Sequence, residues 1–198
     1  MWRVKFMISL AAAMLITKGT NSMAADTDKV AVIETKHGKM VVEFFDKDAP
    51  NTVENFQKLA EKSFYDGTTF HRIVKGFMIQ GGDPLSKDPN NSRVGTGDPG
   101  YKIKAEFNKN KHVLGVLSMA RAQDPDSAGC QFFICLGDAP FLDGQYTAFG
   151  KLIAGTDVLK KIGDLPTKMG PMGEKSVPEE RVVIEHIKMM SRAEASKK

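Results

Sequence analysis

Short apolar runs separated by polar turns recur along most of the chain. Residues 30–35 (VAVIET) and 40–45 (MVVEFF) flank the sequence KHGK, with Gly38 at the turn, and this pattern predicts a β-hairpin. The same kind of short, turn-bounded run predicts further strands along the chain. These strands are expected over residues 68–74, 77–80, 113–120, 131–136, 147–153 and 181–189.

Two segments have helical spacing instead. Residues 48–51 (DAPN) supply capping residues, and the segment 52–64 then places Val53, Phe56, Ala60 and Phe64 three or four positions apart. Residues 155–162 predict a short second helix, and the Asp-, Pro-, Asn- and Gly-rich stretch 86–101 predicts a long surface loop. Many short strands with only two helices favour an antiparallel barrel over repeated strand–helix–strand units. We therefore predict a mainly β fold, a closed antiparallel β-barrel capped by two α-helices.

The N-terminus has the pattern of a secretory signal peptide. Arg3 and Lys5 precede eleven apolar residues at 6–16, and a polar, small-residue region follows. Ser22 and Ala24 fit positions −3 and −1 of a cleavage after Ala24, and a cut after Ala25 fits nearly as well. A buried N-terminal helix is the weaker alternative, because the stretch is apolar all round. We expect residues 1–24 to be removed and the protein to cross the inner membrane into the periplasm.

Composition narrows the class of protein. Hydrophobic residues make up 41% of the chain and charged residues 26%, which is ordinary for a folded globular protein. Cleavage after Ala24 removes three of the 28 basic residues and no acid, leaving 25 basic against 24 acidic. The high overall pI is therefore no sign of nucleic-acid binding. No apolar run approaches the ~18 residues of a membrane span. We expect one domain at 25–190 and a polar tail at 191–198.

Generic catalytic and metal motifs are weak here. Residues 95–100 (GTGDPG) match a dinucleotide-binding pattern, but Pro99 and an extended segment follow where a helix should begin. The histidines show no paired metal-ligand spacing, so we expect no metal and no cofactor. Cys130 and Cys135 lie five residues apart in one predicted strand, about 16 Å at ~3.3 Å per residue. We expect both thiols to be free.

One segment is far more specific. Residues 70–84 (FHRIVKGFMIQGGDP) resemble the signature of the cyclophilin family of peptidyl-prolyl cis-trans isomerases. Four other stretches agree with that family in order and spacing, and the resemblance runs from about residue 30 to about residue 189. They are TVENF at 52–56, GVLSMARA at 115–122, SAGCQFFIC at 127–135 and FLDGQYTAFGKL at 141–152.

The resemblance implies a site on the outer face of the barrel. It makes Arg72 the catalytic arginine, gives Gln80 and Gln131 the role of hydrogen-bonding the substrate backbone, and places Ala120 and Arg121 on the strand that holds this backbone. Two positions at the pocket rim depart from the better-known eukaryotic members, which have tryptophan and histidine where Phe141 and Tyr146 stand. The hydrophobic pocket for the substrate proline is implied to consist of Phe77, Met78, Phe133 and Leu142.

The expected function follows from this resemblance. The protein is predicted to accelerate rotation about X–Pro bonds in unfolded or flexible polypeptides, to assist the folding of exported proteins, to bind cyclosporin weakly and to be a monomer. Periodicity alone favours a plainer interpretation, in which Phe77 and Met78 are core residues and Arg72 is solvated. The competing function is a non-catalytic peptide-binding module or holdase chaperone on the same fold. A pure binder would not need the arginine, which argues for the enzyme.

Overall fold

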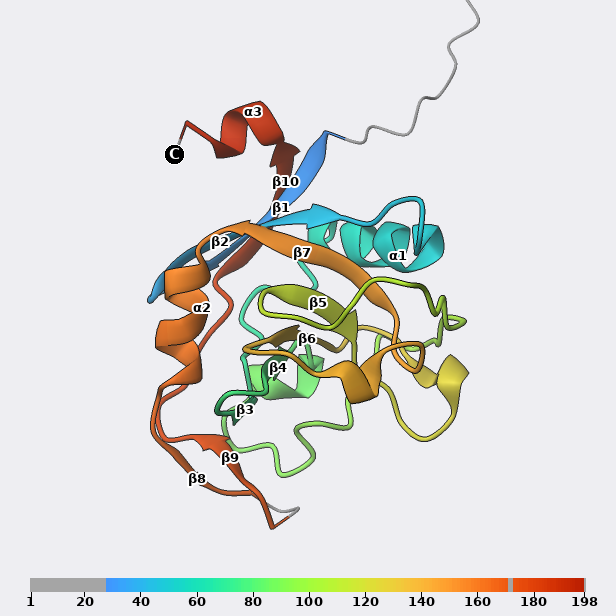
Figure 1. Ribbon diagram of the computed structural model, residues 1–198. Helices are drawn as coiled ribbons and strands as arrows, with labels where there is room; N and C mark the ends of the chain where they lie inside the picture. Colours follow the sequence, from blue (N-terminus) through green and yellow to red (C-terminus); the bar gives the residue numbers. More distant parts are fainter. Residues whose placement is uncertain (1–27, 171–172, 198) are drawn as a thin grey trace, which may run out of the picture.

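The computed structural model describes residues 28–170 and 173–197, and one curled antiparallel sheet dominates it (Figure 1). The predicted signal peptide lies outside the described residues. Eight strands form the sheet in the order β10-β1-β2-β7-β5-β6-β4-β3. They are β1 (Lys29–Thr35), β2 (Gly38–Phe44), β3 (Arg72–Val74), β4 (Met78–Gly81), β5 (Val116–Met119), β6 (Phe132–Cys135), β7 (Ala148–Ala154) and β10 (His186–Ser191).

The β1–β2 hairpin confirms the prediction from its alternating apolar residues. The two strands pair antiparallel from Val30 opposite Glu43 to Thr35 opposite Gly38. Gly38 has a φ of 130°, and a Cβ there would lie 2.7 Å from a methyl group of Val158. Glycine is therefore required at this turn, because any side chain would collide with the neighbouring helix.

Helices α1 (Pro50–Glu61) and α2 (Thr156–Gly163) lie on different sides of the curled sheet (Figure 1). Helix α1 packs against β7 and β10, and α2 packs against β2, β3 and β4. From α1, Phe56 enters the centre of the barrel, where its ring centroid lies 5.1 Å from that of Tyr65 and 5.3 Å from those of Phe132 and Phe149. All four of these rings are fully buried. This aromatic cluster packs the centre of the barrel.

The prediction of a fully closed barrel is wrong in one respect. The edge strands β3 and β10 do not pair with each other. Only the segments before them meet, through a single bridge between Thr69 and Val183 and three flanking backbone hydrogen bonds of 2.8–2.9 Å. Of the predicted strand over 68–74, only Arg72–Val74 forms a strand, and the backbone N–H of Thr69 donates to Ser86 Oγ at 2.8 Å.

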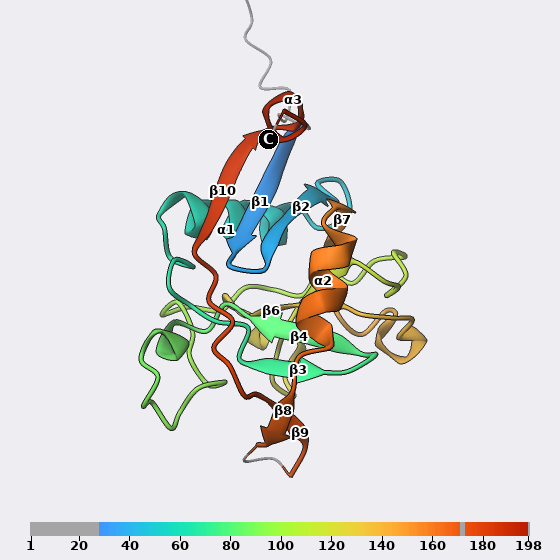
Figure 2. The ribbon, with the colours of Figure 1, turned by 90° about the vertical axis from the view of Figure 1, so that its left-hand side faces the viewer.

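Three elements were not predicted. A small hairpin of β8 (Thr167–Met169) and β9 (Lys175–Pro178) lies at the end of the molecule opposite α3 (Arg192–Ala195) (Figure 2). Helix α3 falls within the predicted polar tail and starts with a capping box between Ser191 and Glu194. The predicted loop at 86–101 is confirmed beyond a short 3₁₀ turn, Pro84–Lys87. Within the described ranges, no helix is long and apolar enough to cross a bilayer.

Candidate active site

The predicted site residues come together as one row of cross-strand neighbours. Arg72 on β3 pairs with Gln80 on β4, Gln80 pairs with Phe133 on β6, and Phe133 pairs with Ser118 on β5. Residues in register point to the same face of a sheet, and their neighbours in sequence point to the other face. Phe132, next to Phe133, is accordingly fully buried in the barrel. The row therefore lies on the outer face, as the resemblance implies.

A second apolar cluster, separate from the barrel core, lies beside this row. We call it the outer cluster, and at its centre are Met78, 1% exposed, Phe133, 5% exposed, and Leu142, 6% exposed. Phe141 lies outside it, is 62% exposed, and has its ring centroid 5.5 Å from that of Phe77. The outer cluster comprises Met78, Phe133, Cys135, Ala139 and Leu142, with Val74, Phe77, Ala120 and Tyr146 packed against it.

Arg72 lies at the edge of the outer cluster. Its Nη1 is 3.9 Å from Met78 Sδ and donates to Gln80 Oε1 at 3.3 Å. On its other side, Nε and Nη2 donate to the two carboxylate oxygens of Glu174 at 2.9 and 3.1 Å. The guanidinium is therefore held in one orientation, with only 24% of the side chain exposed. This geometry contradicts the plainer interpretation of a solvated arginine.

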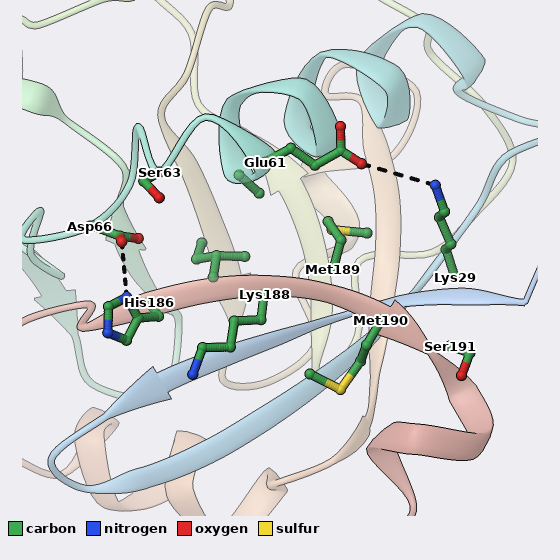
Figure 3. Close-up of a pocket in the computed structure, with 11 residues that line it drawn as sticks. Lys29, Glu61, Ser63, Asp66, His186, Lys188, Met189, Met190 and Ser191 are labelled. Carbon is green, nitrogen blue, oxygen red and sulfur yellow. Dashed lines mark hydrogen bonds and ion pairs between the residues drawn. The ribbon is translucent and has the colours of Figure 1, made fainter.

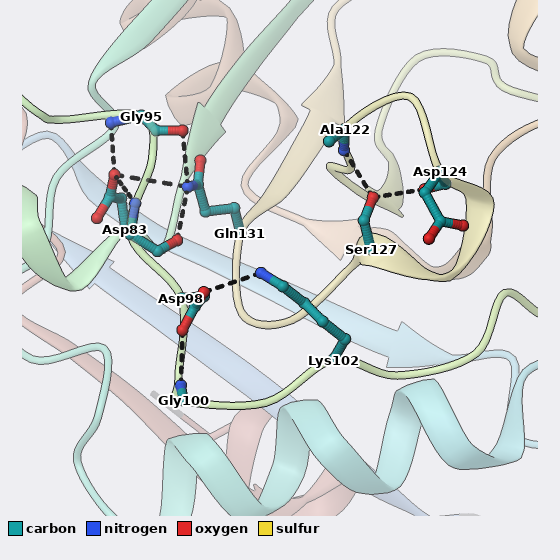
Figure 4. A network of polar contacts seen from close by, with 10 residues as sticks. Asp83, Gly95, Asp98, Gly100, Lys102, Ala122, Asp124, Ser127 and Gln131 are labelled. Carbon is teal, nitrogen blue, oxygen red and sulfur yellow. Dashed lines mark hydrogen bonds and ion pairs between the residues drawn. The ribbon is translucent and has the colours of Figure 1, made fainter.

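The two predicted backbone-binding glutamines form a chain. Gln80 Nε2 donates to Gln131 Oε1 at 3.0 Å, and Gln131 Nε2 donates to the carbonyl oxygens of Gly95 and Gly97 at 3.0 and 2.9 Å (Figure 4). The fully buried Asp83 accepts the backbone N–H groups of the same two glycines. The surface loop is thereby fastened to the site.

The other rim of the site is built from Ala120, Arg121 and Tyr146. The backbone N–H of Ala120 donates to the carbonyl of Gln131 at 3.0 Å. The Arg121 guanidinium lies 4.5 Å from the centroid of the Tyr146 ring and donates to the carbonyl of Gln145. A cavity of about 340 Å³ opens between Arg121, Gln131 and the loop at residues 95–98. Every predicted site residue thus lies in this one region of the outer face.

Behind Phe133 is a buried polar chain that sequence reasoning missed. The ring of His112 stacks on Phe133 with centroids 6.2 Å apart. Its Nε2 lies 2.9 Å from Ser118 Oγ and its Nδ1 lies 3.0 Å from Asp143 Oδ1. Hydrogen bonds from the His112 backbone and ring, with the nearby Lys111 ammonium, lower the pKa of Asp143 to about 2.

Ser118, His112 and Asp143 are connected in the order of a hydrolytic triad, but a substrate cannot reach them. Ser118 is 0% exposed and His112 is 1% exposed, so a substrate carbonyl cannot reach the hydroxyl. The chain instead supports the ring of Phe133 from behind. No spacing in the sequence marks it, since His112 and Asp143 are 31 residues apart.

The cysteines are no candidates for nucleophilic catalysis. Cys130 and Cys135 are both free and buried, in agreement with the prediction that they do not pair. Burial raises the pKa of each thiol to about 12, so the reactive thiolate is not populated at neutral pH.

A cavity of about 440 Å³ between the end of α1 and β10 is a weaker candidate for the site. Four of its polar side chains form two pairs, Lys29 with Glu61 at 4.0 Å and His186 with Asp66 at 2.9 Å (Figure 3). It has no apolar floor comparable to the outer cluster, and it lies on a different part of the molecule from the row of Arg72.

The chain is similar to known proteins over most of its length. Residues 30–189 match the family described as cyclophilin type peptidyl-prolyl cis-trans isomerase. A peptidyl-prolyl cis-trans isomerase of Synechococcus elongatus is 52% identical over 121 residues, which cover 61% of this chain and 78% of that protein. One of Helicobacter pylori is 47% identical over 141 residues, covering 68% of this chain and 82% of that protein.

Solved structures agree with the sequence relatives. A cyclophilin type isomerase of Cryptosporidium parvum, crystallised in the presence of the dipeptide Ala-Pro, superposes with a TM-score of 0.73 at 33% identity. The match covers 82% of this chain and 99% of that one. A cyclophilin from Hirschia baltica superposes with a TM-score of 0.66 at 25% identity, covering 82% of this chain and 74% of that one.

Proposed function

The chain belongs to the cyclophilin-type peptidyl-prolyl cis-trans isomerase family, and we propose that it isomerises X–Pro bonds of exported polypeptides with Arg72 as its catalytic residue. The isomerase activity follows from the family. The role of Arg72, the pocket and the exported substrates are the parts that we propose. The observation that carries the first two is the position of the Arg72 guanidinium, fixed at the edge of an apolar cluster that lies on the outer face of the barrel.

The chemistry of the bond explains why such an arrangement suffices. The cis and trans forms of an X–Pro amide are nearly equal in energy, but rotation faces a barrier of about 18–20 kcal/mol from amide resonance. In the twisted state the lone pair is localised on the proline nitrogen. An N–H group that donates to this nitrogen stabilises the twisted state more than either planar state, which lowers the barrier. No proton is transferred and no covalent intermediate forms.

The described contacts support a part for each group in this proposal. Arg72 Nη1 faces Met78 and Gln80, so it is the nitrogen nearest the outer cluster, where the proline ring would bind. Exclusion of water by Phe133, Leu142 and Met78 strengthens the hydrogen bond from the cation. Gln80 and Gln131 offer amide groups to the substrate backbone beside the pocket. The dipeptide used with the C. parvum structure supports proline-containing substrates.

The intact catalytic set favours an enzyme over a non-catalytic holdase. If Arg72 stabilises the twisted amide, Arg72→Ala removes about 2–4 kcal/mol, or roughly 30- to 1000-fold in rate. Folding and peptide affinity should be nearly unchanged. Arg72→Lys should recover only part of the rate, because an ammonium lacks the planar fork of the guanidinium. A protease-coupled assay on an X–Pro peptide measures the rate. Near wild-type turnover in folded Arg72→Ala would contradict the catalytic role of Arg72.

The rate should also be nearly independent of pH between about 6 and 8, since no side chain exchanges a proton. His71 is the internal control, because it adjoins Arg72 and burial lowers the pKa of its imidazole. His71→Ala should keep the flat profile. A profile that depends on His71 would assign it a proton-transfer role that the mechanism above does not contain.

The exported location rests on the sequence of the N-terminus. Arg3, Lys5, the apolar stretch and the Ser22/Ala24 pair support cleavage after Ala24 or Ala25 and transfer to the periplasm. The intact mass of protein recovered from an envelope fraction tests this directly. The mature product contains no tryptophan, because Trp2 is the only one in the chain. A full-length mass in the cytosol would exclude export.

A further inference from the structure

We propose that Glu174 is a positioning residue for catalysis. Its carboxylate accepts two hydrogen bonds from Arg72 and so orients Nη1 toward the proline pocket. This inference rests on the proposed function of Arg72. Glu174 lies outside the stretches that resemble the family, 102 residues after Arg72, and reaches it from the β8–β9 hairpin.

The two hydrogen bonds are a matched pair. Nε donates to Oε2 at 2.9 Å and Nη2 donates to Oε1 at 3.1 Å, which is the parallel fork that guanidinium and carboxylate favour. Such a fork fixes the plane of the guanidinium as well as its position. The hydrogen bonds of Arg72 are the largest influence lowering the pKa of Glu174, so the carboxylate is ionised at neutral pH.

The fork also decides which nitrogen is available to the substrate. Glu174 engages Nε and Nη2, on the edge of the guanidinium away from the outer cluster. Nη1 makes the two longest contacts, 3.3 Å to Gln80 Oε1 and 3.9 Å to Met78 Sδ. A substrate nitrogen therefore displaces the weakest partners of Arg72 and leaves the fork intact. Arg72 need not reorient during the reaction, which is the condition for preorganised stabilisation.

The backbone of Glu174 is itself held within the hairpin. The carbonyl of Glu174 accepts the backbone N–H of Gly170 at 2.8 Å and the hydroxyl of Ser176 at 3.4 Å. Strand β9, which follows Glu174, packs against β3, which carries Arg72. The two hydrogen bonds between Arg72 and Glu174 thus join β3 to the hairpin that packs against it.

The contact has consequences for stability as well as for orientation. The side chains of Arg72 and Glu174 are 24% and 36% exposed, and a bidentate arginine–carboxylate pair is the geometry in which a partly exposed ion pair can stabilise a fold. The carboxylate also has an opposite effect, since it partly offsets the positive charge that polarises the amide. Orientation outweighs this offset if a misplacement of about 1 Å costs up to about 100-fold in rate. The two effects predict opposite signs for removal of Glu174.

The experiment compares Glu174→Ala, Glu174→Gln and a control, Glu179→Ala, which removes a carboxylate from the other end of β9. NMR exchange on a proline peptide gives turnover and peptide affinity separately. Glu174→Ala should lower turnover by roughly 10-fold with affinity within about twofold. Glu174→Gln keeps one acceptor for the guanidinium and should recover at least half of that loss on a logarithmic scale. Glu179→Ala should match the wild type.

A second comparison separates positioning from a general loosening of the hairpin. In the Arg72→Ala background, removal of Glu174 should change the residual rate by less than about twofold, because its effect passes through Arg72. Unchanged or faster turnover in Glu174→Ala would overturn the proposal, as would a similar drop in the Arg72→Ala background. The proposed function fails by a different result, full activity of Arg72→Ala itself.

Discussion

Strands β4 and β6 present two apolar faces that are covered in different ways. On the inner face, Ile79 and Phe132 are fully buried, and the aromatic rings of α1 and the barrel wall close over them. On the outer face, Met78 and Phe133 are nearly as buried, but loop residues cover them, among them Leu142. The inner face is closed by secondary structure and the outer face by side chains from loops.

The difference shows how one sheet can be both a core and a binding surface. Alternation along a strand supplies apolar residues to both faces, so it does not itself make a pocket. We propose the outer face as the site because polar groups lie at its edge, with Arg72 and Gln80 in the same row as Phe133. A proline ring that binds there meets apolar carbon beneath it and hydrogen-bond donors beside it.

Replacement of Phe132 and of Phe133 should give the largest difference between the inner and the outer face. Phe132→Ala should lower the free energy of unfolding by about 3–5 kcal/mol, because it leaves a cavity in a core that cannot collapse around it. Phe133→Ala should cost less stability, since loops can relax over the gap, and should lower isomerase activity by more than about tenfold. Denaturant unfolding and the peptide assay measure the two effects. If the two variants lost equal stability and had equal activities, the inner and outer faces would not differ in function.

A substitution at the rim of the outer cluster should have a smaller effect, limited to inhibitor binding. Phe141 is exposed, and the tryptophan found there in better-known family members adds an indole N–H donor. A hydrogen bond is worth about 0.5–1.5 kcal/mol, so Phe141→Trp should lower the cyclosporin inhibition constant by about 2- to 12-fold. Phe107→Trp, at another exposed phenylalanine, is the control. Equal inhibition constants for wild type and Phe141→Trp would show that this position does not limit binding.

The polar support behind Phe133 should appear in the pH dependence of stability. Asp143 has a folded-state pKa of about 2, below its ordinary value of 3.8. A lowered pKa means that its contribution is complete above about pH 4 and is lost as the pH falls toward 2. Asp143→Asn should reduce the loss of unfolding free energy across that window, measured by chemical denaturation. The same slope in wild type and variant would contradict this assignment.

The two thiols should hardly react in the native protein, so their reactivity tests whether water is excluded from both faces. Cys130 packs with the barrel core and Cys135 with the outer cluster, and burial raises the pKa of both to about 12. Neither should react appreciably with a thiol reagent at pH 7.5 until the protein unfolds, when both should titrate. Rapid native reaction of Cys135 alone would show that water enters the outer cluster.

Local pattern was a good guide wherever the structure depends on local geometry. The β1–β2 hairpin, α1 and α2 follow their apolar spacing, and the alternation FFIC already required Phe132 and Phe133 to face opposite ways. The β8–β9 hairpin escaped prediction because its strands are three and four residues long and contain a single buried residue, Ser176. Such short strands leave too few apolar positions to reveal a period.

The amino-acid sequence by itself determined the strand faces, the family resemblance and the residues at the proposed site, because side-chain alternation and motif identity are properties of neighbouring residues. The tertiary structure alone decided which groups complete that site. Glu174 reaches Arg72 across 102 residues, and Asp143 reaches His112 across 31. The incomplete closure of the barrel, in which β3 and β10 do not pair and only Thr69 bridges Val183, also belongs to the tertiary structure. Such contacts depend on the path of the chain in space, which no local period records.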